Sequence, residues 1–177
     1  RLLRGALIVS GPVNVETYRE NLADGVLLTA SHDGYARRFG IIHRRAIMLA
    51  SDGSRIDGED AIETAQGASG KLGAGDFAIR FHLHPAVKAS RLSDARGVML
   101  VLPNRDVWTF ETREDKVDLE DSVFLAGSDG PRRTAQIVIR QNARQAPNIR
   151  WSFSRSAGGV AATTARRNAR REPELPL

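Results

Sequence analysis

The sequence predicts an all-β protein, an antiparallel β-sandwich of about ten to twelve strands. Three observations support this prediction. Short runs in which apolar and polar residues alternate follow one another along most of the chain. Short polar turns separate many of these runs. Before the C-terminal tail, no segment shows the apolar period of an amphipathic helix.

The first half of the chain contains a predicted β-hairpin. Asp52 and Gly53 form a pair that favours the positive φ angles of a tight turn, and apolar positions alternate on both sides of it. A loop rich in glycine and small residues, 64–75, closes this half. The alternating runs before the loop are predicted strands: 13–18, 26–32, 47–49 and 56–62.

The second half of the chain contains the other predicted strands. The continuously apolar run 98–102 predicts a strand that is buried on both faces. Asp121 falls on the apolar phase of its run, which predicts a β-bulge there. The predicted strands are 77–85, 98–102, 107–111, 117–120, 136–139 and 149–154.

Four aromatic residues lie at alternating positions on two of these strands: Trp108, Phe110, Trp151 and Phe153. Such residues could form an aromatic platform for a sugar. Their even spacing on strands favours packing in the core, and core packing is the preferred interpretation.

Composition limits the domain organisation and the partners. The chain has 177 residues and a formal net charge of +5. We predict a β-sandwich domain over 1–156, a fragment of a larger protein, and a disordered linker and basic tail over 157–177 with a few helical turns. The charge fits either attraction to polyanions, such as acidic polysaccharide or nucleic acid, or a solubilising surface.

Several classes of site and partner are excluded. The chain has no cysteine, so it forms no disulfide and no thiolate metal site. No apolar run approaches the roughly 20 residues that span a bilayer, so no membrane partner is expected. The sequence contains no recognised nucleic-acid module, phosphate-binding glycine loop or serine nucleophile motif. Nucleic-acid binding through the arginine-rich tail therefore stays open only as the weakest interpretation.

The strand from Phe77 to Pro85 contains the first candidate site. Its apolar residues fall on one face, which leaves Arg80, His82 and His84 together on the other. These three residues are candidate substrate-binding residues for an anionic ligand. A histidine pair at this spacing can bind zinc, but hydrogen bonding to nearby backbone is the preferred interpretation, so no metal site is assigned.

A second polar cluster holds the other two histidines. His32, Tyr35 and Arg37 lie in or next to a predicted turn, where ligands commonly bind, and they complete the set of candidate substrate-binding residues. The aspartate and glycine between His32 and Tyr35 also have the chemistry of an ordinary turn. For His43 and its two following arginines we expect cross-strand pairing with Glu59 or Asp60.

The motifs of these clusters resemble the heparinase II/III-like proteins of bacteria, in order over roughly residues 10–155. The blocks that carry the resemblance are Ala30–Gly40, Ile42–Arg45, Gly58–Asp60, Arg80–Pro85, Glu120–Val123 and Gly130–Ile137.

The resemblance implies the architecture of a polysaccharide lyase, in which an N-terminal α-helical toroid precedes a C-terminal antiparallel β-sandwich. Such proteins cleave uronic-acid-containing polysaccharides by β-elimination. Their catalytic tyrosine and asparagine or glutamate lie on the toroid. A catalytic histidine and the ligands of a structural zinc come from a loop early in the β-domain.

The chain resembles the distal part of that β-sandwich and lacks this loop. The resemblance therefore implies no catalytic residue, no metal ligand and no cofactor in this chain, although zinc belongs to full-length members of the family. It implies that the chain supports the active-site cleft and is not active alone. The expected partners are an acidic polysaccharide and the toroid of the same polypeptide, in the periplasm or cell envelope. The alternative is a non-catalytic carbohydrate-binding or interaction module.

Overall fold

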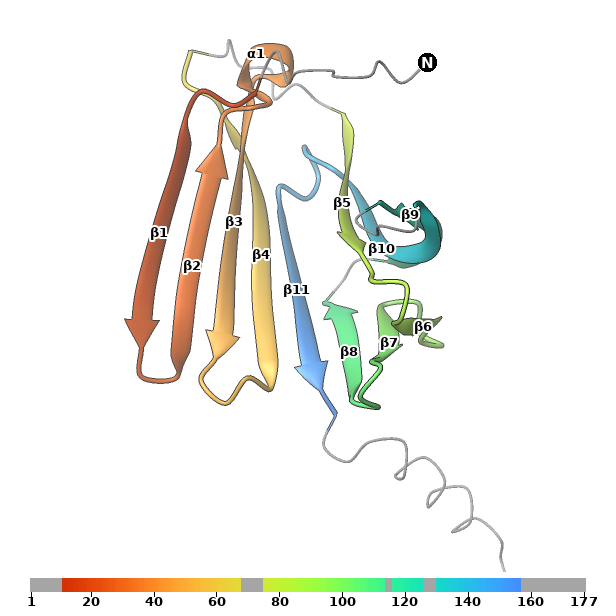
Figure 1. The fold of residues 1–177 in the computed structure, drawn as a ribbon. Helices are drawn as coiled ribbons and strands as arrows, with labels where there is room; N and C mark the ends of the chain where they lie inside the picture. The colour runs from red at the N-terminus through yellow and green to blue at the C-terminus, as the bar shows by residue number, and fades with distance from the viewer. Residues whose placement is uncertain (1–10, 68–74, 114–115, 126–129, 157–177) are drawn as a thin grey trace, which may run out of the picture. The chain divides into compact units, whose positions relative to one another are not determined.

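The computed structural model describes residues 11–67, 75–113, 116–125 and 130–156. These residues form eleven β-strands and one helical turn, α1 (Ala36–Phe39), and the strand pairings are antiparallel (Figure 1). The predicted all-β class and strand number are confirmed. No helix among these residues has the length and apolar character needed to cross a membrane.

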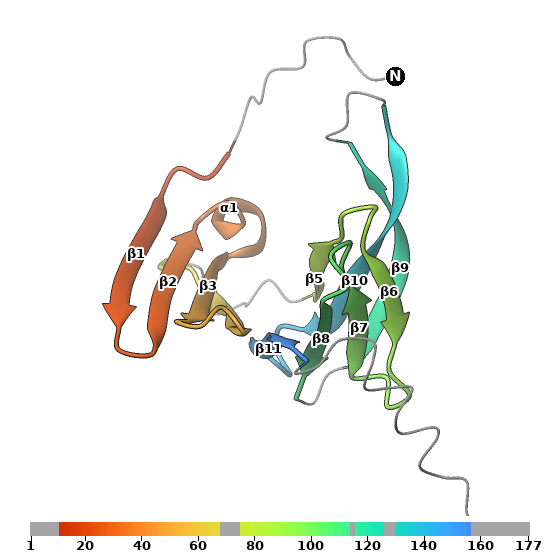
Figure 2. The same cartoon turned by 60° about the horizontal axis from the view of Figure 1, so that its bottom comes forward.

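The chain divides into two compact units, of which the first contains residues up to Ala78 together with Arg140–Trp151. Its sheet begins with a meander in the order β1-β2-β3-β4 (Figures 1 and 2). Gly53, at a φ of 67°, occupies the turn between β3 and β4, as the sequence predicted. The meander strands are β1 (Val15–Leu22), β2 (Gly25–His32), β3 (Ile41–Ala50) and β4 (Arg55–Thr64), and β11 (Asn148–Arg155) begins in this unit.

The register of this meander collects polar side chains on one face. His32 lies opposite His43, and Arg45 lies opposite Asp60. Because directly paired residues of antiparallel strands point to the same face, and residues two apart on a strand share a face, these four side chains lie on one side of the sheet.

The second unit comprises Ile79–Ile139 together with the part of the chain after Trp151. One sheet has the order β8-β7-β6 within this unit, and a three-stranded sheet has the order β5-β10-β9. The strands are β5 (Asp76–His82), β6 (Lys88–Arg91), β7 (Gly97–Val101), β8 (Val107–Thr112), β9 (Val117–Phe124) and β10 (Arg132–Asn142), with β5 and β10 each extending by a few residues into the range of the first unit.

An aromatic cluster forms much of the core of the second unit. The ring of Phe110, which is fully buried, lies 5.0 Å from that of Phe81 and 4.8 Å from that of Phe153 between centroids. Tilted contacts at this separation are favourable for aromatic rings. The preference for core packing is therefore confirmed for Phe110 and Phe153, and Trp151 is buried as well.

Two local predictions are wrong. Strand β7 is not buried on both faces, because Met99 is 38% exposed between the buried Val98 and Leu100. A run of apolar residues does not reveal whether its second face is covered. No bulge occurs at Asp121, since the pairing of β9 with β10 continues without interruption. Asp121 stays in the same alternation as Val117 and Leu119 and is exposed.

The predicted tail, 157–177, and most of the predicted glycine-rich loop lie outside the described residues.

Candidate functional site

The most concentrated polar cluster of the first unit is centred on Asp60. This carboxylate is only 1% exposed, and it accepts hydrogen bonds from three side chains. His43 donates through Nε2 at 2.7 Å, and Trp151 donates through Nε1 at 2.7 Å. Arg45 donates twice, through Nε at 2.8 Å and Nη2 at 3.0 Å. We refer to Asp60, His43, Arg45 and Trp151 as the Asp60 cluster.

Local sequence explains how this cluster forms. The β3–β4 hairpin sets Arg45 opposite Asp60, and His43 follows on the same face. Gly58 lies two positions before Asp60, and a Cβ at this glycine would overlap the indole ring of Trp151. The absence of a side chain there makes room for the ring, which brings Nε1 to the carboxylate.

The cluster keeps Asp60 ionised in spite of its burial. Burial by itself would raise the pKa of Asp60, but the hydrogen bonds from His43, Arg45 and Trp151 and the charge of Arg45 hold that pKa below its usual range. No buried side-chain nitrogen or oxygen among the described residues lacks a hydrogen-bond partner. The cluster is therefore a complete buried ion-pair network.

The network continues from His43 to the end of β2. Nδ1 of His43 lies 3.3 Å from Nε2 of His32, and Nδ1 of His32 accepts a hydrogen bond from the backbone N–H of Gly34 at 3.2 Å. We call the path from Gly34 through His32 and His43 to Asp60 the histidine relay. Each ring nitrogen in it already has a partner, so the relay as it stands offers no nitrogen to a metal or a substrate.

The turn that follows β2 carries the remaining candidates of this unit. The ring of Tyr35 lies 5.2 Å from that of His32 between centroids, and Tyr35 is 46% exposed. Arg37 is exposed on α1. The carboxylate of Asp33 accepts hydrogen bonds from the backbone N–H groups of Asn14 and Val13. The bond from Asn14 is the largest cause of the lowered pKa of Asp33.

The other three candidates lie in the second unit. Arg80, His82 and His84 are exposed, while Ile79 and Leu83 are buried, so the alternation predicted for this segment is confirmed. Nδ1 of His82 lies 2.9 Å from Oγ of Ser122 on β9.

His84 follows the end of β5 and has two neighbours. Its Nδ1 accepts a hydrogen bond from the N–H of Ala86 at 3.2 Å, and its ring lies 5.0 Å from that of Phe124 between centroids. The guanidinium of Arg132 lies 5.5 Å from the centre of the Phe124 ring. This end of the three-stranded sheet therefore presents a guanidinium and an imidazole beside an aromatic ring.

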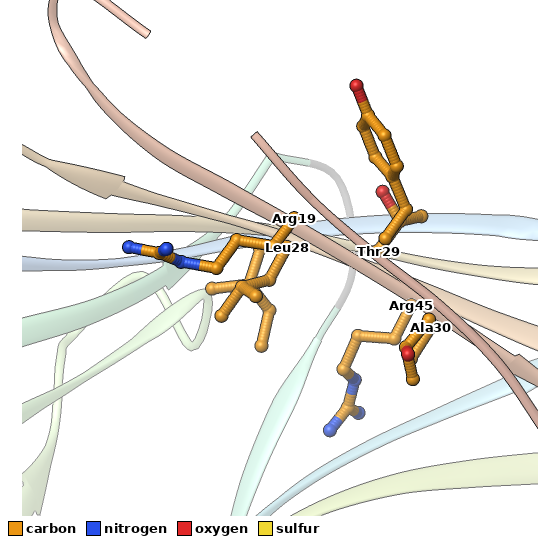
Figure 3. A pocket seen from close by; sticks show the side chains of 8 residues that line it. Arg19, Leu28, Thr29, Ala30 and Arg45 are labelled. Atoms are coloured by element: carbon orange, nitrogen blue, oxygen red, sulfur yellow. The ribbon is translucent and has the colours of Figure 1, made fainter. Parts of the chain in front are cut away.

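A shallow pocket of about 520 Å³ lies on β1, β2 and β3 (Figure 3). The side chains of Arg19, Leu28 and Arg45 lie on one side of the strands in this view. None of the six candidate residues lines this pocket. No group of three or more histidine and acidic side chains in the described part of the chain is placed to hold a metal ion.

The expectation that His43 and Arg45 pair with Asp60 is confirmed, and Arg44 instead lies 3.6 Å from Glu63. Sequence reasoning missed the contact between the two histidines and the hydrogen bond from Trp151. The contact between the histidines follows from the register of β2 on β3. Alternation in the sequence predicts both strands, but it does not show which residues lie opposite one another. The hydrogen bond from Trp151 joins residues 91 positions apart, and no local pattern contains it.

The fold of this chain is similar to part of several solved heparinase structures. The heparan sulfate lyase HepC from Pedobacter heparinus superposes with a TM-score of 0.65 at 9% identity, over 84% of this chain and 23% of that protein. A structure of heparinase III gives a TM-score of 0.63 at 16% identity, over 83% and 22%. These likenesses show the fold alone.

Sequence comparison identifies the family of the chain. The family described as Heparinase II/III-like, C-terminal, matches residues 5–152, and the chain belongs to this family. It is also 32% identical over 161 residues to a Caulobacter vibrioides protein named FtsZ-localized protein C. The match covers 87% of this chain and 27% of that relative, so the chain spans about a quarter of the length of the proteins it resembles.

Proposed function

We propose that this chain is the C-terminal β-domain of a longer heparinase II/III-like protein and that it binds acidic polysaccharide as a supporting wall of the active-site cleft. The observation that carries this proposal is the exposed row of Arg80, His82 and His84, in which His84 lies against Phe124 and Arg132 lies over the same ring. Guanidinium and imidazole groups bind carboxylates and sulfates, and an aromatic ring offers an apolar contact to a sugar. The net charge of +5 favours the same class of ligand.

The domain does not catalyse elimination alone in this proposal. β-Elimination needs a base within hydrogen-bond reach of the proton it removes. Every ring nitrogen of His32 and His43 already has a partner in the relay, so these two histidines supply no base to a substrate. We place the catalytic groups on other parts of the polypeptide, with a separate helical domain as the proposed source.

A two-part experiment tests this function. We expect the longer protein to release unsaturated uronate, followed by its ultraviolet absorbance, from heparan sulfate, hyaluronan or alginate. The chain alone is expected to bind the cleaved polymer without releasing product. Product from the chain alone contradicts the supporting role, and no product from the longer protein on any uronate polymer contradicts the lyase assignment.

Arg80 provides a sharper test of the binding surface. Replacing it with alanine in the longer protein should weaken polysaccharide binding by about tenfold, the value of a charge-assisted hydrogen bond, with a smaller effect at high salt. Arg150→Ala is the matched control, because it removes the same charge from an exposed side chain that pairs with Glu59 instead. Equal losses in the two variants, measured by titration calorimetry, would indicate a general effect of charge and contradict a specific surface.

A second function is supported by the relative with the name FtsZ-localized protein C. Under this alternative the domain is a non-catalytic interaction module that associates, directly or through a partner, with FtsZ. Co-sedimentation of the longer protein with FtsZ polymers, together with no polysaccharide binding, supports the alternative. Polysaccharide binding without co-sedimentation supports the first function.

A further inference from the structure

Hydrogen-bond directions along the histidine relay follow from its chemistry. A backbone N–H can only donate, so Nδ1 of His32 must be unprotonated where it faces Gly34. A neutral imidazole carries its proton on the other nitrogen, so Nε2 of His32 donates to Nδ1 of His43. His43 then carries its own proton on Nε2 and donates it to the carboxylate of Asp60. With both rings neutral, each hydrogen bond of the relay has one donor and one acceptor, and every bond donates in the direction from Gly34 to Asp60.

The relay has no place for an additional proton. A proton on His32 adds to Nδ1 and removes the acceptor that holds the N–H of Gly34. A proton on His43 adds to Nδ1, so His32 must accept through Nε2 and carry its own proton on Nδ1. That tautomer again sets an N–H of His32 against the N–H of Gly34. A proton added to either histidine therefore breaks the hydrogen bond to Gly34 or separates the two rings.

Charged groups around the relay act in opposite directions. Asp60, from β4, favours a proton on His43, whereas Arg45, from β3, disfavours it and occupies the same carboxylate. Trp151, from β11, donates to that carboxylate without titrating. On the turn itself, Tyr35 lies against His32, and the carboxylate of Asp33 is held by the backbone N–H groups of Val13 and Asn14, just before β1. On α1, Arg37 and Arg38 are exposed, and Arg38 lies over the ring of Phe39.

We propose that His32 is a proton-operated latch on the turn between β2 and α1. In the neutral state its Nδ1 holds the amide of Gly34, directly before Tyr35. Uptake of one proton by the relay releases this amide, while Asp33 stays bonded to the backbone of Val13 and Asn14. The inference concerns the protein alone and does not depend on the proposed function.

Nuclear magnetic resonance tests both states of the latch. At about pH 8, correlations through the imidazole rings should show His32 protonated only on Nε2, with Nδ1 bare. Between about pH 8 and about pH 5, hydrogen-exchange protection of the Gly34 amide should fall on the order of fivefold, the loss of one net hydrogen bond. The amide of Ile62, which donates to Pro147, should remain protected.

Two variants separate the latch from a general effect of acid. His32→Asn supplies a side-chain oxygen that accepts from the N–H two residues on but cannot titrate, so protection of Gly34 should become independent of pH. His84→Asn is the matched control, since His84 makes the same kind of bond to Ala86 in the other unit. This control should leave the pH response of Gly34 unchanged.

Each contrary result overturns the proposal. A proton on Nδ1 of His32 at about pH 8 contradicts the hydrogen-bond directions. Unchanged protection of Gly34 in acid contradicts release, and parallel loss of protection at Ile62 points to global unfolding. A pH response that persists in His32→Asn assigns the effect to another group.

Discussion

Asp60→Asn is expected to destabilise the protein by about 3 kcal/mol at neutral pH, because it removes the buried charge that accepts hydrogen bonds from His43, Arg45 and Trp151. An asparagine has the shape of aspartate but only one acceptor oxygen. Its amide group must then face donors from His43, Arg45 or Trp151, whichever way it is turned. Urea unfolding followed by tryptophan fluorescence measures the change in the free energy of unfolding.

The cost of this substitution should depend on pH. The pKa of Asp60 is lowered in the folded protein, so the unfolded chain binds a proton more readily than the folded one as the pH falls. The stabilisation from Asp60 is therefore complete above the ordinary aspartate pKa of about 3.9 and decreases as the pH falls through the lower folded value. The difference between wild type and Asp60→Asn should shrink in the same range.

Glu59→Gln provides the control for both measurements. Glu59 is the chain neighbour of Asp60 and pairs with Arg150, but both side chains are substantially exposed. Such a pair contributes about 0–1 kcal/mol, so the variant should unfold almost as wild type does. A cost for Asp60→Asn as small as that for Glu59→Gln would contradict the central role of Asp60.

Gly58→Ala is the second substitution with a large expected effect, a destabilisation of about 3 kcal/mol. The added methyl group would overlap the indole ring of Trp151, which is 5% exposed and has little room to move. Displacing the ring also breaks the hydrogen bond from Nε1 to Asp60, so packing and polar terms are lost together. Thermal unfolding and the fluorescence of Trp151 should both change.

The matched control for this glycine lies in the neighbouring turn. Gly53→Ala adds the same methyl group where nothing lies within 4 Å, although the φ of 67° makes it strained. Its cost of about 1 kcal/mol measures backbone strain without a clash. If Gly58→Ala costs no more than Gly53→Ala, the close approach of Trp151 is not a constraint.

Alternation predicted most of the strands because it is a local property of the backbone. The Asp52–Gly53 turn likewise fixed the β3–β4 hairpin, and this hairpin placed Arg45 opposite Asp60. The contact of His32 with His43 depends instead on how many residues the α1 connection takes up between β2 and β3. Burial was harder to predict than strand position, as Met99 and Asp121 show, because neighbours distant in sequence decide which face is covered.

Strand β1 ends the strand order in the described part of the chain, and all eight of its residues are exposed. The unpaired backbone N–H and C=O groups of an edge strand can hydrogen-bond to a strand of another chain, and repeated pairing of this kind produces fibrils. Glu16, Arg19 and Glu20 place charge of both signs along this margin, so a second copy that stacks there must strip water from ionised groups. These charged side chains therefore oppose aggregation through the exposed edge strand.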